Sequence, residues 1–182
     1  MNPGIEIRLL RRTDDVSGFR CGNAQLDRFI QHYARQNQFK YHVSTTWVAV
    51  SAGHVLGYAT VTVATVERST HPNEKLRKRL PGYPLPVLRL ARLGVDEGAR
   101  GLGLGERLMR HVFLLALEQA RQVGCLGVLV DAKPDALGFY ERLGFLALNQ
   151  IEEGVLHGDS TPMFLPLADL EAAVASDSDS LA

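Results

Sequence analysis

Residues 100–108 of the chain read RGLGLGERL, and this stretch decides how the surrounding sequence folds. The apolar run of residues 87–96 before it predicts a β-strand, and from Leu104 onward apolar residues recur with helical spacing through about Arg121. A helix therefore begins inside the glycine cluster, where its first backbone N–H groups have no partner within the helix. Such a terminus attracts anions, and glycines let a diphosphate approach the backbone closely. The stretch predicts a phosphate-binding turn between a strand and a helix.

Two better-known phosphate-binding motifs do not fit residues 100–108. A Walker loop needs Gly-Lys-Ser or Gly-Lys-Thr after the glycines, and neither follows. The GxGxxG pattern of dinucleotide-binding domains matches poorly, because the preceding strand comes after a predicted hairpin and does not open a βαβ unit. Taken alone, the glycines are also compatible with a purely structural tight turn.

The rest of the sequence predicts one α/β (α+β) domain over residues 1–170. Strand patterns cover residues 5–9, 44–51, 54–67, 87–96, 125–132, 145–148 and 162–167, and helical patterns cover residues 23–38, 104–121 and 134–143. In the first helix Asn23 is the predicted N-cap, and the spacing of apolar residues, Tyr33 among them, predicts one buried face. Ala52-Gly53 is the predicted turn of a hairpin. Residues 67–86 predict a long basic loop with a helical turn at its centre. This order predicts a mixed, mostly antiparallel sheet with helices on both faces, followed by a disordered acidic tail over residues 171–182.

Length and composition are typical of an ordinary globular protein. The chain has 182 residues, 46% of them apolar and 22% charged, and no apolar run reaches the roughly 20 residues that cross a bilayer. The start, MNPGIEIRLLRR, lacks the apolar core of a signal peptide, so we expect a cytoplasmic protein. The two cysteines and six histidines show no metal-ligand spacing, so we expect neither a disulfide nor a metal site.

The formal net charge is zero, but the charges are distributed unevenly along the chain. Residues 1–95 hold 14 Lys and Arg against 6 Asp and Glu, whereas residues 96–182 hold 6 against 14. A cationic face built from the first part would suit an anionic partner such as nucleic acid. The two parts can equally interleave in space, so that their fields cancel.

Two motifs, in the right order, resemble those of the GNAT acetyltransferases. Arg100-x-x-Gly103-x-Gly105 after RLARLGVD is similar to the R/Q-x-x-G-x-G/A signature that cradles the pyrophosphate of acetyl coenzyme A, and DAKPDALGFYERLGF resembles the family's closing motif. The resemblance implies the GNAT fold, with acetyl coenzyme A as co-substrate and no metal. The residues to which it assigns cofactor binding are Leu93, Gly94, Val95, Arg100, Gly101, Leu102, Gly103, Leu104 and Gly105.

The resemblance also implies a mechanism. The strand at residues 92–95 would splay from its neighbour, so that its free backbone groups bind the pantetheine arm and polarise the thioester carbonyl. Tyr140, at the position of the family's reactive tyrosine, would protonate the departing thiolate, because a phenol with a pKa of about 10 is still protonated at neutral pH. The alternative is a structural tyrosine whose hydroxyl is bonded to the backbone.

A narrower resemblance covers most of the chain. FRCGNAQLDRFIQHYARQN, LPGYPLPVLRLARLGVD and PMFLPLADL are similar to segments of the TacT-like acetyltransferase toxins of bacterial type II toxin–antitoxin modules. Those toxins acetylate the α-amino group of aminoacyl-tRNA and stop translation. The resemblance therefore implies aminoacyl-tRNA as acceptor, a ribbon-helix-helix antitoxin and a homodimer. Arg20 and Gly94 depart from the group, which more often has aspartate and alanine at these positions, and this leaves the acceptor open.

The residues point to the acceptor only indirectly. No carboxylate or histidine stands out as a general base, although Glu67 and Glu97 could act through water. The missing base favours an α-amino group as acceptor, because an α-amine with a pKa of about 7.7–8.0 is already partly neutral at working pH.

The basic residues predicted to contact nucleic acid are Arg77, Lys78, Arg79 and Arg92. A solvated loop is the alternative explanation of this run. The other functional hypotheses are acetylation of a small-molecule amine or a protein N-terminus, and a non-catalytic module that binds coenzyme A or an antitoxin.

Overall fold

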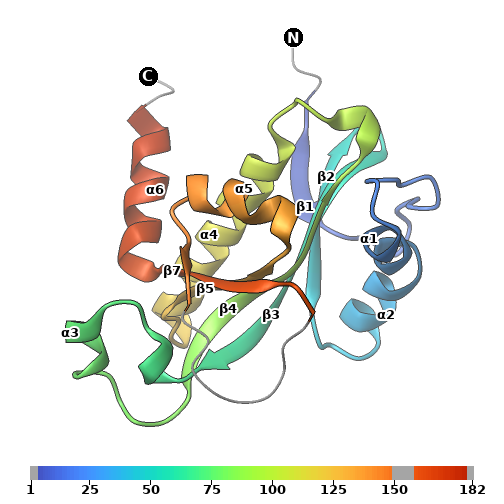
Figure 1. Cartoon of the computed structure of the whole chain (residues 1–182). Helices are drawn as coiled ribbons and strands as arrows, with labels where there is room; N and C mark the ends of the chain where they lie inside the picture. Colours follow the sequence, from blue (N-terminus) through green and yellow to red (C-terminus); the bar gives the residue numbers. More distant parts are fainter. Residues whose placement is uncertain (1–3, 149–157, 180–182) are drawn as a thin grey trace. The chain divides into compact units, whose positions relative to one another are not determined.

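The computed structural model describes residues 4–148 and 158–179, in which seven strands form one sheet (Figure 1). Their order across the sheet is β1-β2-β3-β4-β5-β7-β6. The strands are β1 (Glu6–Leu9), β2 (Thr45–Ser51), β3 (His54–Val66), β4 (Leu85–Val95), β5 (Gly127–Ala132), β6 (Leu146–Ala147) and β7 (Thr161–Pro166). The predicted α/β class is confirmed.

All the α-helices except the C-terminal one follow the predicted order. The helices are α1 (Ala24–Arg28), α2 (Ala34–Phe39), α3 (Glu74–Arg77), α4 (Leu104–Gln122), α5 (Leu137–Arg142) and α6 (Leu167–Asp179). The predicted start of α4 at Leu104 is confirmed, and Gly124, with φ of +104°, follows its end. Among the described residues, no helix is both long enough and apolar enough to span a membrane.

The chain divides into two compact units, each made of two separate stretches. The first unit comprises Met1–Thr62 and Leu90–Val112, and the second comprises Val63–Arg89 and Phe113–Ala182. The single domain predicted over residues 1–170 stays a prediction.

In the first unit, residues 23–39 pack against the hairpin of β2 and β3. The Asn23 side chain accepts hydrogen bonds from the N–H groups of Gln25 and Leu26, as predicted for the residue that caps this helix. The turn between the strands is Ala52-Gly53, with φ of +48° and +81°. The main members of the buried cluster are Phe29, Ile30, Ala34, Val48, Val50, Val55 and Tyr58.

The helix predicted over residues 23–38 is interrupted by a π-helical turn, Phe29–Tyr33. In this turn the N–H of Ala34 bonds to the carbonyl of Phe29, five residues earlier. The extra residue rotates Tyr33 outward, so its side chain is 37% exposed and its hydroxyl accepts a hydrogen bond from Arg28. The predicted burial of Tyr33 is wrong, because the prediction assumes a uniform 3.6-residue period.

The start of α4 covers the opposite face of these strands in the first unit. The Trp47 ring on β2 lies against the ring of His111, with centroids 4.1 Å apart. Val48, the next residue of the strand, belongs to the cluster formed with residues 23–39. Since successive side chains of a strand point to opposite faces, this unit has helices on both faces of its strands, as predicted.

In the second unit, β7 lies between β5 and β6 and pairs antiparallel with both. Its residues Met163, Phe164 and Leu165 are each 1% exposed and form part of the core. Gly127 begins β5 because a Cβ at this position would lie 2.2 Å from the Leu165 carbonyl oxygen. The basic loop also belongs to this unit, and α3 is the helical turn predicted at its centre.

The C-terminal segment differs from the prediction. Composition predicts disorder over residues 171–182, whereas α6 extends to Asp179 and its Leu170 side chain is completely buried. The alanines of this segment favour a helix, and the buried leucine attaches its first turn to the core. Residues 180–182 lie outside the described residues.

Candidate active site

The end of β4 carries the residues predicted to bind the cofactor arm, at positions 93–95. Gly94 packs against Tyr58, since a Cβ at position 94 would lie 3.0 Å from Cε1 of that ring. The Tyr58 hydroxyl donates to the carbonyl of Leu26 at 2.8 Å, so the ring is fixed in turn. The next N–H beyond β4, that of Asp96, donates to the Leu56 carbonyl at 2.9 Å. This N–H bond therefore joins the strand end to β3, and the predicted splaying of residues 92–95 from a neighbouring strand stays a prediction.

The glycine loop, residues 100–105, connects β4 to α4. Gly101 and Gly103 have φ of +80° and +67°, left-handed values that glycine adopts without strain. Within the part of the chain that the structure describes, the backbone N–H groups of residues 101–106 donate to no protein acceptor. The first bonded N–H is that of Arg107, which donates to the Gly103 carbonyl at 3.1 Å. The loop therefore presents free donors at the positive end of a 19-residue helix, an arrangement that binds phosphate.

The Arg100 side chain contacts the protein itself. Its Nη2 donates to the Cys21 carbonyl at 2.9 Å and lies 3.8 Å from Oε1 of Glu97. Because the side chain is 64% exposed, its other N–H groups face solvent. Its predicted contact with a diphosphate stays a prediction.

Cys21 is not a nucleophile in this arrangement. Burial raises the pKa of its thiol to about 11, so the thiol is protonated near neutral pH. Its N–H donates to Oδ1 of Asp27 at 2.8 Å, which fixes the residue beside the start of α1. The residue has a structural role.

Tyr140 lies in the second unit, on α5, and is 6% exposed. Its ring packs edge to face against Phe139 and Phe145, with centroids 5.1 Å and 5.4 Å away. In residues 4–148 and 158–179, no hydrogen-bond partner of its hydroxyl is found, which argues against the structural alternative. Burial raises the pKa of this phenol, so it is protonated throughout the neutral range. A protonated, unpaired hydroxyl is able to donate a proton to a ligand.

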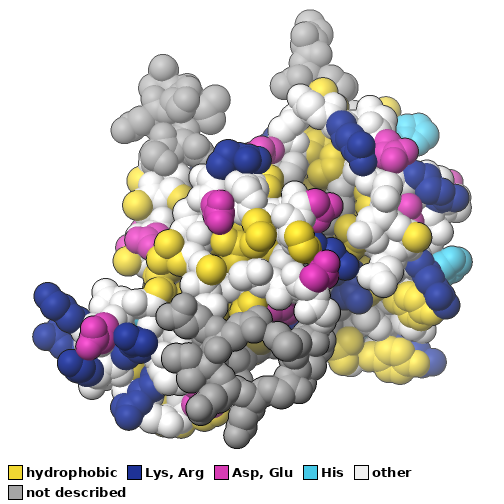
Figure 2. All heavy atoms as spheres, in the orientation of Figure 1, with side chains coloured by type: hydrophobic (Ala, Val, Ile, Leu, Met, Phe, Trp, Pro, Cys, Tyr) yellow, Lys and Arg dark blue, Asp and Glu magenta, His cyan; other side chains and the backbone are white. Residues whose placement is uncertain are grey.

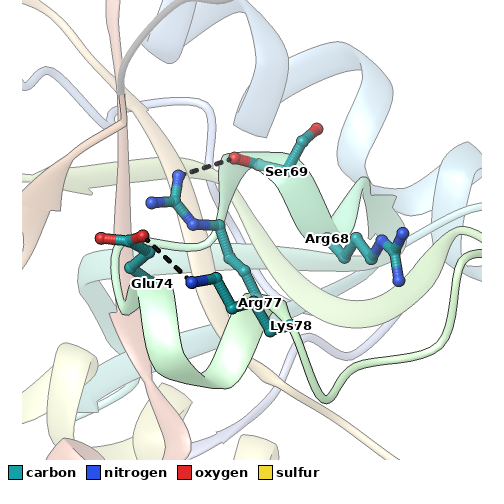
Figure 3. A pocket seen from close by; sticks show the side chains of 5 residues that line it. All are labelled: Arg68, Ser69, Glu74, Arg77 and Lys78. Atoms are coloured by element: carbon teal, nitrogen blue, oxygen red, sulfur yellow. Dashed lines mark hydrogen bonds and ion pairs between the residues drawn. The ribbon is translucent and has the colours of Figure 1, made fainter.

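Three of the predicted nucleic-acid residues lie together in the second unit. Figure 2 shows dark blue side chains gathered over α3, at the lower left, with one acidic side chain among them. A shallow pocket of about 480 Å³ lies here, and its lining residues, drawn in Figure 3, are Arg68, Ser69, Glu74, Arg77 and Lys78. Arg79 follows α3 and is exposed.

Among the described residues that line this pocket, Glu74 is the one carboxylate that balances the cations. Lys78 Nζ lies 3.5 Å from Oε1 of Glu74, whereas Arg77 donates to the Ser69 carbonyl at 3.3 Å. Arg68 donates to the Leu80 carbonyl at 3.2 Å. Both arginines therefore bond to neutral carbonyls, and the pocket keeps a net positive charge that suits phosphate.

A buried histidine, not predicted from the sequence, holds the start of α3. His71 is 3% exposed, its Nδ1 accepts a hydrogen bond from the N–H of Asn73 at 3.0 Å, and its ring packs edge to face on Phe164. Asn73 in turn caps the helix through the N–H of Leu76. The Asn before EKLR indicates the cap, but no sequence signal marks His71 as buried.

The fourth predicted nucleic-acid residue, Arg92, lies in the first unit. Its guanidinium carbon lies 4.0 Å above the centre of the Phe29 ring, within the range of a cation–π contact. The structure thus brings Arg77, Lys78 and Arg79 together and places Arg92 on the other unit. It likewise places all the predicted cofactor residues in the first unit and Tyr140 in the second.

Comparison with known proteins agrees with this arrangement of elements. The family model described as an acetyltransferase (GNAT) domain matches residues 42–146, more than half of the chain. A tRNA-acetylating toxin of Mycobacterium tuberculosis is 31% identical over 139 residues, which cover 76% of this chain and 82% of the relative.

Solved structures of similar fold include two of the AtaT toxin system. The structure of AtaT complexed with acetyl-methionyl-tRNAfMet has a TM-score of 0.81 at 26% identity, and the match covers 93% of this chain and 98% of that one. The structure of AtaTR bound with AcCoA has a TM-score of 0.74, also at 26% identity, over 92% of this chain and 96% of that one.

Proposed function

This chain belongs to the GNAT family of acetyltransferases, and on that premise we propose that it acetylates the α-amino group of aminoacyl-tRNA and so blocks translation. The donor is acetyl coenzyme A, as the resemblance of both motifs to the family implies. The observation that carries the proposal is the row of unpaired N–H groups at residues 101–106, which fits the diphosphate of that co-substrate.

The proposed reaction breaks a thioester bond and forms an amide bond. The neutral amine nitrogen attacks the acetyl carbonyl carbon, whose oxygen becomes negative, and a backbone N–H at residues 93–95 stabilises it by about 3 kcal/mol per donor. The carbon–sulfur bond then breaks. Tyr140 donates its proton to the coenzyme thiolate, the amine loses a proton to water, and water returns a proton to the Tyr140 phenolate, so that no net proton is gained or lost.

An α-amine is the acceptor that best suits this set of residues. A lysine amine, with a pKa of about 10.4, needs a base before it can attack, whereas an α-amine with a pKa of about 7.7–8.0 is already partly neutral. The two candidate bases, Glu67 and Glu97, are both exposed. The likeness to the tRNA-acetylating toxin supports the same acceptor.

The basic residues supply the proposed contacts with tRNA. Arg77, Lys78 and Arg79 would bind backbone phosphates at α3, because Lys and Arg provide most of the sequence-independent affinity for nucleic acid. Arg92 would bind a further phosphate from the first unit, where its stacking on Phe29 limits the motion of its guanidinium.

We also infer the cellular setting from the toxin likeness. A translation-blocking enzyme acts in the cytoplasm, where charged tRNA is found, and needs a neutralising partner, which we propose to be a ribbon-helix-helix antitoxin. A homodimer is part of the same proposal. Sedimentation of the purified chain, alone and with the product of an adjacent reading frame, tests both assemblies.

A direct assay tests the acceptor. The protein is incubated with acetyl coenzyme A and charged tRNA, and N-acetylated aminoacyl-tRNA is measured by mass spectrometry after mild hydrolysis. Acetylation of free amines or peptide N-termini, with charged tRNA left unmodified, would instead support a small-molecule or protein acceptor. Release of coenzyme thiol no faster than background would indicate a non-catalytic binding module.

A further inference from the structure

Residues 20–22, which we call the support segment, lie against the residues that lead into the glycine loop. Three hydrogen bonds join the support segment to residues 96–100. The Arg20 N–H donates to Oδ2 of Asp96 at 2.9 Å, and the Arg20 carbonyl accepts from the Glu97 N–H at 2.8 Å. Nη2 of Arg100 donates to the Cys21 carbonyl at 2.9 Å. All these residues belong to the first unit. A segment distant in the sequence therefore contacts the loop at its entry.

Asp96 uses both of its carboxylate oxygens in this contact. Oδ2 accepts the N–H of Arg20, and Oδ1 accepts the N–H of Gly98 at 2.9 Å, which caps the 3₁₀ turn Glu97–Ala99 before the loop. Hydrogen bonds to a charged acceptor are among the stronger ones in proteins. Asp96 therefore fixes the turn and joins it to the support segment.

Gly22 leaves the space that this contact occupies. Its φ is +88°, and a Cβ at this position would lie 3.0 Å from both Nη2 of Arg100 and Oε1 of Glu97. A side chain there would strain the backbone and displace the Arg100 guanidinium. The support segment is itself held by Asp27, which accepts the N–H of Cys21, and by the Asn23 cap of α1.

We propose that Asp96 and Gly22 are positioning residues for the coenzyme: through the support segment, they hold the glycine loop in its binding conformation. The proposal rests on the proposed function, in which this loop binds the diphosphate of coenzyme A. Among residues 4–148 and 158–179, the N–H groups of residues 101–106 have no acceptor, so no hydrogen bond of their own to these residues fixes that conformation. A glycine-rich loop loses much entropy on ordering, and contacts that order it before binding raise the affinity for the ligand.

Titration of coenzyme A by calorimetry tests the two positioning residues. Asp96→Ala and Gly22→Ala should each weaken coenzyme A binding by about tenfold, the loss expected for one charge-assisted hydrogen bond. The KM for acetyl coenzyme A should rise by the same factor. Both kcat and the KM for the acceptor should stay within about twofold of wild type, because the reacting groups are unchanged.

Asp14→Ala is the matched control for a merely structural effect. The Asp14 carboxylate, in the same unit, accepts hydrogen bonds from Arg8 at 2.8 Å and from the N–H of Arg11 at 2.7 Å, and neither partner belongs to the support segment or the glycine loop. This substitution should lower the melting temperature as Asp96→Ala does, yet leave the Kd for coenzyme A unchanged. Should Asp96→Ala fail to fold, Asp96→Asn, which keeps one oxygen acceptor, should weaken binding by a smaller factor.

Wild-type affinity for coenzyme A in folded Asp96→Asn or Gly22→Ala would overturn the positioning role. An equal loss of affinity in Asp14→Ala would overturn it as well, since the effect would then come from stability alone. Failure of the wild-type chain to bind coenzyme A is a different result, because it would remove the proposed function itself.

Discussion

At Tyr140, burial keeps the phenol protonated, and the missing hydrogen bond leaves that proton available to a ligand. The surrounding rings remove water and raise the pKa of the phenol, while its hydroxyl has no acceptor among the described residues. Tyr58 is the instructive contrast, since it is also buried but its hydroxyl donates to the carbonyl of Leu26. Of these two tyrosines, only Tyr140 has a proton left to give to a ligand.

Replacement of Tyr140 by Phe should therefore separate catalysis from stability. We expect kcat to fall by about 100-fold, the usual contribution of a positioned proton donor, with the Kd for acetyl coenzyme A unchanged. The melting temperature should stay close to that of wild type, because the ring packing is kept and no hydrogen bond is lost. A Tyr140→Phe enzyme with wild-type kcat would show that another group protonates the thiolate.

The element α3 depends on His71 in a way that makes it sensitive to pH. Burial, followed by the nearby charge of Arg77, lowers the pKa of His71 below its ordinary value. The unfolded chain therefore binds a proton more readily than the folded one. The free energy of unfolding therefore falls with acid: the contribution of neutral His71 is complete above the unfolded pKa of about 6.5 and is lost as the pH falls below it.

Acid should thus loosen the start of α3 before the rest of the protein unfolds. Protonation of Nδ1 removes the acceptor of the Asn73 N–H, so we expect the amide resonances of Asn73 and Leu76 to shift together with the His71 ring as the pH falls below about 6.5. The measurement is an NMR titration. Amide resonances that stay fixed while the His71 ring titrates would contradict this coupling.

Strand β5 depends on the missing side chain of Gly127. Gly127→Ala should lower the free energy of unfolding by about 2 kcal/mol, because its Cβ would overlap the Leu165 carbonyl of the paired strand β7. Chemical denaturation measures the loss. Gly82→Ala is the control in the same unit, since nothing lies within 4 Å of a Cβ there and its stability should be unchanged. Equal stability of the two variants would refute the prediction.

At the scale of the whole molecule, the cations of α3 should make acceptor binding depend on salt. Replacement of Arg77, Lys78 and Arg79 by Gln should weaken tRNA binding and reduce the slope of log K against log salt by about one unit for each lost phosphate contact. Fluorescence anisotropy with labelled tRNA at several salt concentrations gives the slope. The control is a variant in which Arg121 and Lys133 are replaced by Gln. It also loses positive charge but should leave the slope unchanged. An unaltered slope in the α3 variant would favour the solvated-loop interpretation.

The sequence predicted local features well wherever one short stretch carries the physical cause. The Asn23 cap, the Ala52-Gly53 turn and the start of α4 at Leu104 depend only on neighbouring residues, and all are confirmed. The exposed Tyr33 and the helical α6 were not predicted, because a π-helical turn and the burial of Leu170 depend on packing against distant residues.

The sequence by itself determined the family, the order of the strands and of the helices up to α5, and the glycine loop, because hydrophobic period, glycine backbone freedom and the unpaired N–H groups of a helix start are local properties. Tertiary structure alone decided what surrounds that loop. It brought residues 20–22 onto Asp96 and Arg100, stacked Arg92 on Phe29 and buried His71 beneath α3. These contacts join residues far apart along the chain, and no local pattern of apolar or charged residues encodes such a pairing.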